Sequence, residues 1–191
     1  KIPGSNSTVI LSNGRRDASA LKRDGVQTEY STIFGKWYFE ITVFIPAEVQ
    51  KAPALGVSTA NYNPANWLGS DRYSWAWWTH EGTKYTNDSQ GFYNQGLKLK
   101  DKDAVSVLID LQDNSKIEFW VNGVPVGVLY DNLPQLTPLY FTFNAVNDSY
   151  LSANFGQNAF KYPVPTDHYP GFGVLKNPPP ARGTLLTTYC K

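Results

Sequence analysis

Apolar and polar residues alternate along most of the patterned segments of this chain, which is the period of a β-strand with one buried face. Residues 36–45 (K-W-Y-F-E-I-T-V-F-I) are rich in β-branched and aromatic residues and stop at Pro46. The alternation puts Trp37, Phe39, Ile41, Val43 and Ile45 on one face and Tyr38, Glu40, Thr42 and Phe44 on the other. Strands of the same character are predicted at residues 104–111, 117–121, 125–129, 138–144 and 150–155.

The segments between these strands have turn chemistry. Asn122-Gly123 lies between two apolar runs and predicts a two-residue hairpin, because both residues accept positive φ. Residues 113–115 (D-N-S) and Glu81-Gly82 predict two further hairpin turns. No window repeats apolar residues at helical spacing, so many short strands and regular turns favour an all-β, antiparallel two-layer sandwich.

Four of the six tryptophans fall between residues 67 and 85. Strand alternation over residues 74–79 puts Trp75 and Trp77 on one face and Trp78 on the other. One of those faces must pack on the second sheet, so we expect the W-A-W-W cluster to build the fold. Trp67 lies before that strand, in a polar loop, and is a candidate for contact with a ligand.

Composition limits the chemistry. The net charge is +1 and the charges are scattered, so no basic stripe indicates nucleic acid. No apolar run approaches the length of a membrane span. The single cysteine, Cys190, excludes an internal disulfide, and with only His80 and His168 it excludes a thiolate–imidazole zinc site. We therefore expect no metal and no cofactor.

Catalysis has weak support in the sequence. There is no G-x-S-x-G nucleophile motif, and the histidines stand in turn or proline-rich contexts. A carboxylate pair for glycoside hydrolysis stays possible, but Glu40 and Glu118 lie within strands, where a solvent-facing charge is the ordinary explanation. The loop at residues 60–73 (A-N-Y-N-P-A-N-W-L-G-S-D-R-Y) combines rings with amides, a pattern that fits sugar or peptide recognition. Packing of this loop onto the sandwich is an equally good explanation.

An ordered set of motifs resembles the SPRY domain, the core of the B30.2 family. The first are G-K-W-Y-F-E-I at residues 35–41, L-G-V-S-T-A at 55–60, and S-W-A-W-W with G-T-K-Y-T-N at 74–87. The others are V-S-V-L-I-D-L at 105–111, I-E-F-W-V-N-G-V-P-V-G at 117–127, L-T-P-L-Y at 136–140 and A-N-F-G-Q at 153–157. The resemblance implies a bent sandwich over residues 1–165. The Pro- and Gly-rich residues 166–191 are then expected to be a tail packed on the domain, or a linker.

The opening T-V-I-L-S-N-G and the ending A-N-F-G-Q-N-A-F-K-Y resemble SPRY modules of bacteriophage tail fibres. That likeness implies a non-catalytic, homotrimeric virion protein that attaches to host-surface polysaccharide such as capsule or lipopolysaccharide. The alternative is a cytoplasmic SPRY module that binds a short peptide of a partner protein. A glycan-degrading enzyme is a third hypothesis.

The resemblance also implies a ligand site built from three stretches, at residues 22–25, 62–73 and 146–149. K-R-D-G in the first matches the arginine–aspartate pair of peptide-binding members. In the third, an Asn-Asp pair stands where some peptide-binding members carry tryptophan, which leaves room for a more polar ligand such as sugar. The candidate ligand-binding residues are Arg23, Asp24, Tyr62, Asn63, Trp67, Asp71, Asn147 and Asp148.

Overall fold

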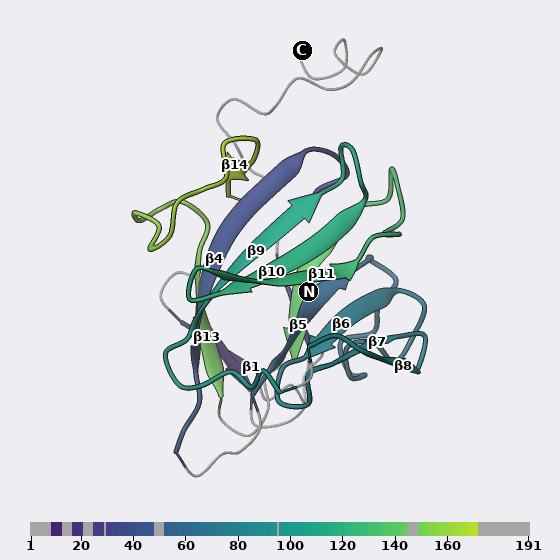
Figure 1. Ribbon diagram of the computed structural model, residues 1–191. Coiled ribbons are helices and arrows are strands. Elements are labelled where there is room, and N and C mark those ends of the chain that lie inside the picture. Colours follow the sequence, from purple (N-terminus) through teal and green to yellow (C-terminus); the bar gives the residue numbers. More distant parts are fainter. Residues whose placement is uncertain are drawn as a thin grey trace.

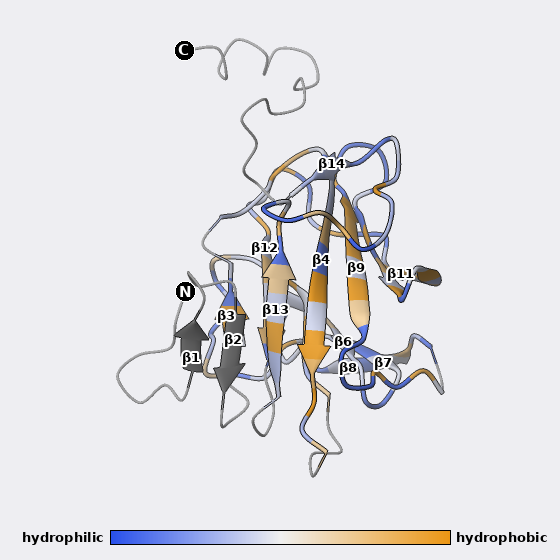
Figure 2. Ribbon diagram, turned by 90° about the vertical axis from the view of Figure 1, so that its left-hand side faces the viewer, coloured by the Kyte–Doolittle hydropathy of each residue, from blue (hydrophilic) through white to orange (hydrophobic). Residues whose placement is uncertain are grey.

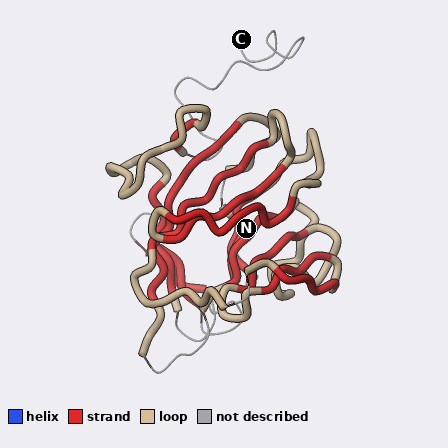
Figure 3. The backbone as a smooth tube through the Cα atoms, in the orientation of Figure 1, coloured by secondary structure: helices blue, strands red, loops and turns tan. Residues whose placement is uncertain are grey.

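The computed structural model describes residues 9–12, 17–20, 25–28, 30–47, 52–94, 96–144 and 149–171. These residues form strands, turns and loops arranged as two sheets, with no helix among them (Figures 1 and 3). No helix in the described part of the chain is long and apolar enough to cross a membrane. Arg23, Asp24, Asn147 and Asp148 lie outside the described residues, as do Cys190 and residues 172–191.

The larger sheet has the strand order β1-β2-β13-β4-β9-β10-β11, and its neighbours along this path are antiparallel. Its strands are β1 (Val9–Ser12), β2 (Asp17–Ala20), β13 (Tyr150–Asn154), β4 (Lys36–Phe44), β9 (Ala104–Asp110), β10 (Lys116–Val121) and β11 (Val124–Tyr130). A short strand, β14 (Tyr169–Pro170), pairs in parallel with the start of β4.

The smaller sheet has the order β3-β12-β5-β6-β7-β8 and is antiparallel throughout. Its strands are β3 (Gly25–Gln27), β12 (Tyr140–Asn144), β5 (Ala54–Ser58), β6 (Ser74–Trp78), β7 (Thr83–Thr86) and β8 (Ser89–Phe92). The predicted all-β, two-layer antiparallel sandwich is therefore confirmed. Figure 2 shows the apolar residues concentrated along β9 and alternating along β4.

The main core lies between the sheets and contains the face of β4 that the alternation predicts. Trp37, Phe39, Ile41 and Val43 are all buried there. Phe39 contacts Phe141 of the opposite sheet edge-on, with ring centroids 4.9 Å apart. Trp75 and Trp77 of β6 face this core, whereas Trp78 belongs to a second cluster on the outer face of the smaller sheet.

The predicted hairpin turns are present. Asn122 and Gly123 adopt φ values of 50° and 80° between β10 and β11, as a two-residue hairpin requires. The β7–β8 hairpin was not predicted, although its turn residues, Asn87 and Asp88, also have positive φ (51° and 59°). Short polar strands on either side made this hairpin hard to recognise.

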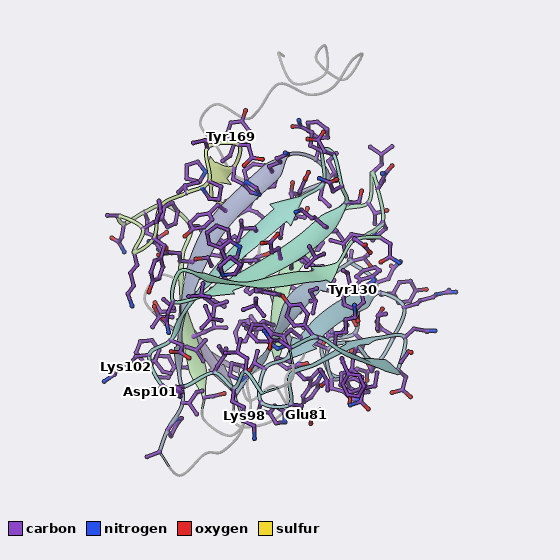
Figure 4. The ribbon with its side chains drawn as sticks, in the orientation of Figure 1. Glu81, Lys98, Asp101, Lys102, Tyr130 and Tyr169 are labelled. Carbon is purple, nitrogen blue, oxygen red and sulfur yellow. The ribbon has the colours of Figure 1, made fainter. Side chains whose placement is uncertain are left out.

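The outer face of β4 corrects one expectation. Glu40 is 6% exposed and Tyr38 is fully buried, so Glu40 does not carry a solvent-facing charge. Residues 159–171, here called the strap, cover this face after the chain leaves β13 (Figure 2). Tyr169 of the strap lies at the end of the sheet away from Asp101 and Lys102 (Figure 4).

Candidate functional site

The loop of residues 59–73 connects β5 and β6 and is folded compactly on itself. The Thr59 N–H donates to the Tyr73 carbonyl (2.9 Å) and closes the base of the loop. Short turns follow inside it, including Asn66 N–H to the Asn63 carbonyl (2.9 Å) and Ser70 N–H to the Trp67 carbonyl (3.1 Å). A loop with this many internal bonds holds a defined shape, as compact surface loops do.

Tyr62 is the internal support of this loop. Its ring is 1% exposed, and its hydroxyl donates to the Asn66 carbonyl at 2.6 Å. A Cβ on Gly25 would collide with this ring, so Gly25 leaves the space that Tyr62 fills. The ligand contact of Tyr62 stays a prediction, and in this structure its ring is buried within the loop.

The structure brings the borders of the three predicted stretches together. Gly25, at the end of the first, donates its N–H to the Pro64 carbonyl at 2.7 Å. Asn144, just before the third, accepts the Leu68 N–H with its Oδ1 and pairs with Gly25 in the sheet. The 59–73 loop therefore contacts both Gly25 at the start of β3 and Asn144 at the end of β12. The predicted residues Arg23, Asp24, Asn147 and Asp148 lie outside the described residues.

Trp67 belongs to the second cluster rather than standing alone in a polar loop. Its ring meets Trp78 edge-on at 5.7 Å and Tyr85 edge-on at 5.3 Å. The indole N–H of Trp78 donates to the Leu68 carbonyl at 3.1 Å, which fixes the loop to β6. Trp67 is nevertheless only partly buried.

Asp71 and Asn63 both cap turns within the loop. The Oδ1 of Asp71 accepts the Tyr73 N–H and the Ser74 hydroxyl, each at 2.9 Å. The Oδ1 of Asn63 accepts the Ala65 N–H at 3.1 Å, while its side chain is exposed. Asn63 is exposed, whereas Asp71 is partly buried and both of its bonds lie within the loop and the start of β6.

The surface of the loop also presents residues that the sequence analysis did not name as candidates. Arg72 is exposed, lies over the Tyr73 ring at 5.1 Å and donates to its hydroxyl at 2.9 Å. That hydrogen bond raises the pKa of Arg72, so the group stays cationic. Burial and the Glu81 carboxylate raise the pKa of Tyr85, which keeps its hydroxyl protonated. The loop surface, defined as Asn61, Asn63, Asn66, Trp67, Arg72, Tyr73 and Tyr85, is therefore amide-rich, aromatic and carries one cation.

The carboxylates and histidines considered for catalysis have structural partners. Glu118 accepts hydrogen bonds from Trp120 (2.7 Å) and Lys116 (3.3 Å). Glu40 accepts three hydrogen bonds, from the Tyr38 hydroxyl and from two strap amides, each at 2.8 Å. His80 lies 3.1 Å from Glu81, and His168 lies 2.8 Å from Asp167. Within the described residues no group of His, Cys, Asp and Glu is arranged to hold a metal ion.

A family model described as the SPRY domain matches residues 36–158, more than half of the chain. The chain belongs to the SPRY domain family. Two solved structures share the SPRY fold. The match to the TRIM65 PSpry domain has a TM-score of 0.63 and 17% identity, and it covers 78% of this chain and 87% of that domain. The SPRY domain of human HERC1, with a TM-score of 0.64 and 13% identity, covers 79% and 94%.

Two curated relatives are eukaryotic proteins. The Set1/Ash2 histone methyltransferase complex subunit ASH2 of Drosophila melanogaster is 26% identical over 179 residues, covering 72% of this chain and 32% of that protein. The ATP-dependent RNA helicase DDX1 of Xenopus laevis is 27% identical over 146 residues, covering 76% and 18%. The chain thus spans a third or less of the length of these relatives.

These comparisons correct the finer part of the resemblance. They match SPRY domains of animal proteins and give no support to a bacteriophage tail fibre, a virion, a homotrimer or a polysaccharide ligand. Of the two segments that suggested the phage likeness, the opening one lies outside the family match, whereas A-N-F-G of the closing one lies inside it. A-N-F-G forms the end of β13 and the turn after it, where the Asn154 Oδ1 accepts the Gly156 N–H at 3.1 Å.

Proposed function

We propose that this SPRY domain is a non-catalytic protein-interaction module that binds a short segment of a partner protein with its loop surface. The observation that carries the proposal is an exposed surface held by internal hydrogen bonds and ring contacts. Tyr62, Asn144 and Trp78 fix the loop from within, whereas the amides, Trp67 and Arg72 face outward. A surface fixed before binding loses little entropy when a ligand docks.

The side chains of the loop surface suit a peptide. Exposed asparagines donate to and accept from peptide backbone groups, and partly exposed rings pack against apolar side chains. Arg72 adds a cation that recognises a carboxylate, and Trp, Tyr and Arg are the residues that dominate binding energy in protein interfaces. We infer a partner segment with an apolar residue next to an acidic one.

The relatives support an intracellular role, as in the cytoplasmic alternative, over a virion. One is named as a subunit of a histone methyltransferase complex and the other as an RNA helicase. Both names describe proteins that act inside cells, and the first describes a protein that works within an assembly. The SPRY modules of such proteins are a better precedent for this chain than a tail fibre.

A peptide-display selection against the chain tests the proposal. We expect enrichment of segments that share an apolar–acidic core, and we expect Trp67→Ala to weaken the selected peptide by about tenfold or more. Arg72→Ala should weaken acidic peptides selectively. Trp120→Ala is the matched control, since Trp120 is also partly buried but lies on β10 of the other sheet.

The same chain on a glycan array separates the two ligand classes. Peptide enrichment that depends on Trp67, with a blank array, supports the proposal. A polysaccharide hit lost in Trp67→Ala would instead replace the peptide with sugar as the ligand of this surface. Release of reducing ends from the bound polysaccharide would revive the enzyme hypothesis.

A further inference from the structure

The strap begins where the family match ends. The SPRY model stops at residue 158, and residues 159–171 cross the outer face of the larger sheet immediately afterwards. A two-layer sandwich normally leaves this face to solvent. Here the strap covers it, and Tyr38 and Ser106 below are both fully buried. The strap therefore lies outside the residues that the family model matches and packs on the sandwich.

Glu40 holds the backbone of the strap. Its carboxylate accepts the N–H groups of two consecutive residues, Lys161 and Tyr162, at 2.8 Å each. The Tyr38 hydroxyl donates to the same carboxylate at 2.8 Å and lies 3.0 Å from the Ser106 hydroxyl. A buried carboxylate needs such donors to offset its lost hydration, so the strap and Glu40 depend on each other.

Aromatic side chains flank this backbone contact. Phe160 meets the Tyr38 ring edge-on, with centroids 5.1 Å apart. Tyr162 reaches the β10–β11 turn, where a Cβ on Gly123 would come within 2.7 Å of its ring. Gly123 is therefore needed twice, for its positive φ and for the space that Tyr162 occupies.

The strap then returns to the start of β4. Tyr169 and Pro170 pair in parallel with Trp37 and Tyr38, and Gly171 donates its N–H to the Tyr38 carbonyl at 2.7 Å. Lys36 lies 2.9 Å from Asp167 of the strap and 3.1 Å from Asp113 of the β9–β10 turn. Figure 4 shows Tyr169 at this end of the sheet.

The contact has the form of a peptide bound to a surface. A segment with aromatic and proline residues, which turns at residues 165–168 before it pairs with β4, is held by backbone hydrogen bonds, two ring contacts and one ion pair. Much of the strap is exposed on its outer side, and a polar depression of about 290 Å³ remains beside it. Thr42, Ser152, Asn154 and Lys161 are among the residues that line this depression.

We propose that the outer face of β4 is a peptide-docking surface, and that the strap is its resident ligand, which detaches and re-docks while the sandwich stays folded. The surface recognises an aromatic residue followed by two free backbone N–H groups, with an acidic residue and a Tyr-Pro pair downstream. This proposal is independent of the loop surface on the smaller sheet.

Amide hydrogen exchange of the full chain tests the detachment. We expect the N–H groups of Lys161, Tyr162 and Gly171 to exchange by a local opening, at least a hundredfold faster than those of β9. Glu40→Gln replaces one acceptor oxygen by a donor, so the strap amides should exchange about tenfold faster again while β9 is unchanged. Glu118→Gln is the matched control, because Glu118 bonds only within β10 among the contacts above. Exchange of the strap amides at the rate of β9 would overturn the proposal.

A peptide added in trans tests the docking surface itself. Phe160→Ala combined with Asp167→Asn weakens the strap and leaves Glu40 and Tyr38 intact. A labelled peptide of residues 158–171 (N-A-F-K-Y-P-V-P-T-D-H-Y-P-G) should bind this variant and bind wild type far more weakly. The reason is that the tethered strap of the wild type competes with the added peptide at an effective concentration of roughly millimolar.

Adding Glu40→Gln to the strap variant should weaken binding of the peptide about tenfold further, since the surface then keeps one acceptor oxygen for two backbone N–H groups. Equal peptide binding with and without Glu40→Gln would place the peptide elsewhere and refute the docking surface. No binding to the folded strap variant would refute it as well, with unchanged β9 exchange as the check on folding.

Discussion

Tyr62 gives the sharpest test of how the loop surface is held. Tyr62→Phe keeps the buried ring but removes the hydroxyl that donates to the Asn66 carbonyl at 2.6 Å. That carbonyl loses its donor, and the Asn144 amide, 3.5 Å from the hydroxyl, loses a neighbour. Loss of one buried hydrogen bond of this kind costs about 1–2 kcal/mol. For a domain of this length, each kcal/mol corresponds to roughly 2–4 °C in Tm, so we expect a fall of about 2–8 °C.

Thermal unfolding followed by circular dichroism measures this loss, and exchange of the loop amides locates it. Tyr150→Phe is the matched control, because Tyr150 is 39% exposed and its ring stacks on Phe44. We expect the control to change the free energy of unfolding by no more than about 0.5 kcal/mol. If Tyr62→Phe unfolded at the wild-type temperature with unchanged exchange at Asn66, the internal support assigned to Tyr62 would be wrong.

Two further predictions follow from the packing and the ion pairs. Gly56→Ala would push a Cβ into the Trp75 carbonyl of the neighbouring strand, so urea unfolding should show that the free energy of unfolding falls by about 3 kcal/mol or more. Gly91→Ala is the control and should be nearly neutral, because its Cβ would only touch the flexible Lys84 side chain at 3.4 Å. The hydrogen bond from Lys36 lowers the pKa of Asp167 from its ordinary 3.8 to about 2. The pair therefore stabilises the docked strap above pH 4, and this stabilisation is lost as the pH falls towards 2. It amounts to less than about 1 kcal/mol, because Asp167 is 57% exposed. The chemical shift of the Gly171 N–H should follow this loss, and Asp167→Asn should remove its pH dependence; a shift unchanged from pH 5 to 2 in wild type would contradict it.

The strands that could be predicted from the sequence are those with strong alternation and a clear turn at their ends. β4, β9, β10 and β11 satisfy both conditions, and their predicted and observed bounds differ by a residue or less. β1, β2 and β3 were missed because they have only three or four residues each and depend on pairing with distant strands. β14 has two residues, and nothing local distinguishes it from the proline-rich sequence around it.

The resemblance predicts a ligand site at residues 62–73, and the amide and aromatic content of residues 60–73 favours recognition. The structure folds these residues into a compact loop, and their role in binding stays a prediction. Which side chains turn inward depends on contacts with residues far along the chain, such as Asn144 with Leu68 and Trp67 with Trp78. Such contacts cannot be predicted from the residues of the loop alone, because they join residues that are distant in the sequence. For that reason the sequence alone does not show that Tyr62 is buried and Arg72 is exposed.

Residues on the outward side of a strand contain more information than the alternation rule uses. On the larger sheet, β4 places Tyr38 and Glu40 outward, and both are buried by the strap. On the smaller sheet, β6 places Trp78 outward, and the 59–73 loop brings Trp67 onto it. Tyr38 and Trp78 are large rings at outward positions that a non-strand segment covers, whereas Tyr150, which pairs with the outward Phe44, is 39% exposed. A large ring at an outward position is therefore a reason to look for a covering segment, and the contacts of the folded chain decide which outward rings are covered.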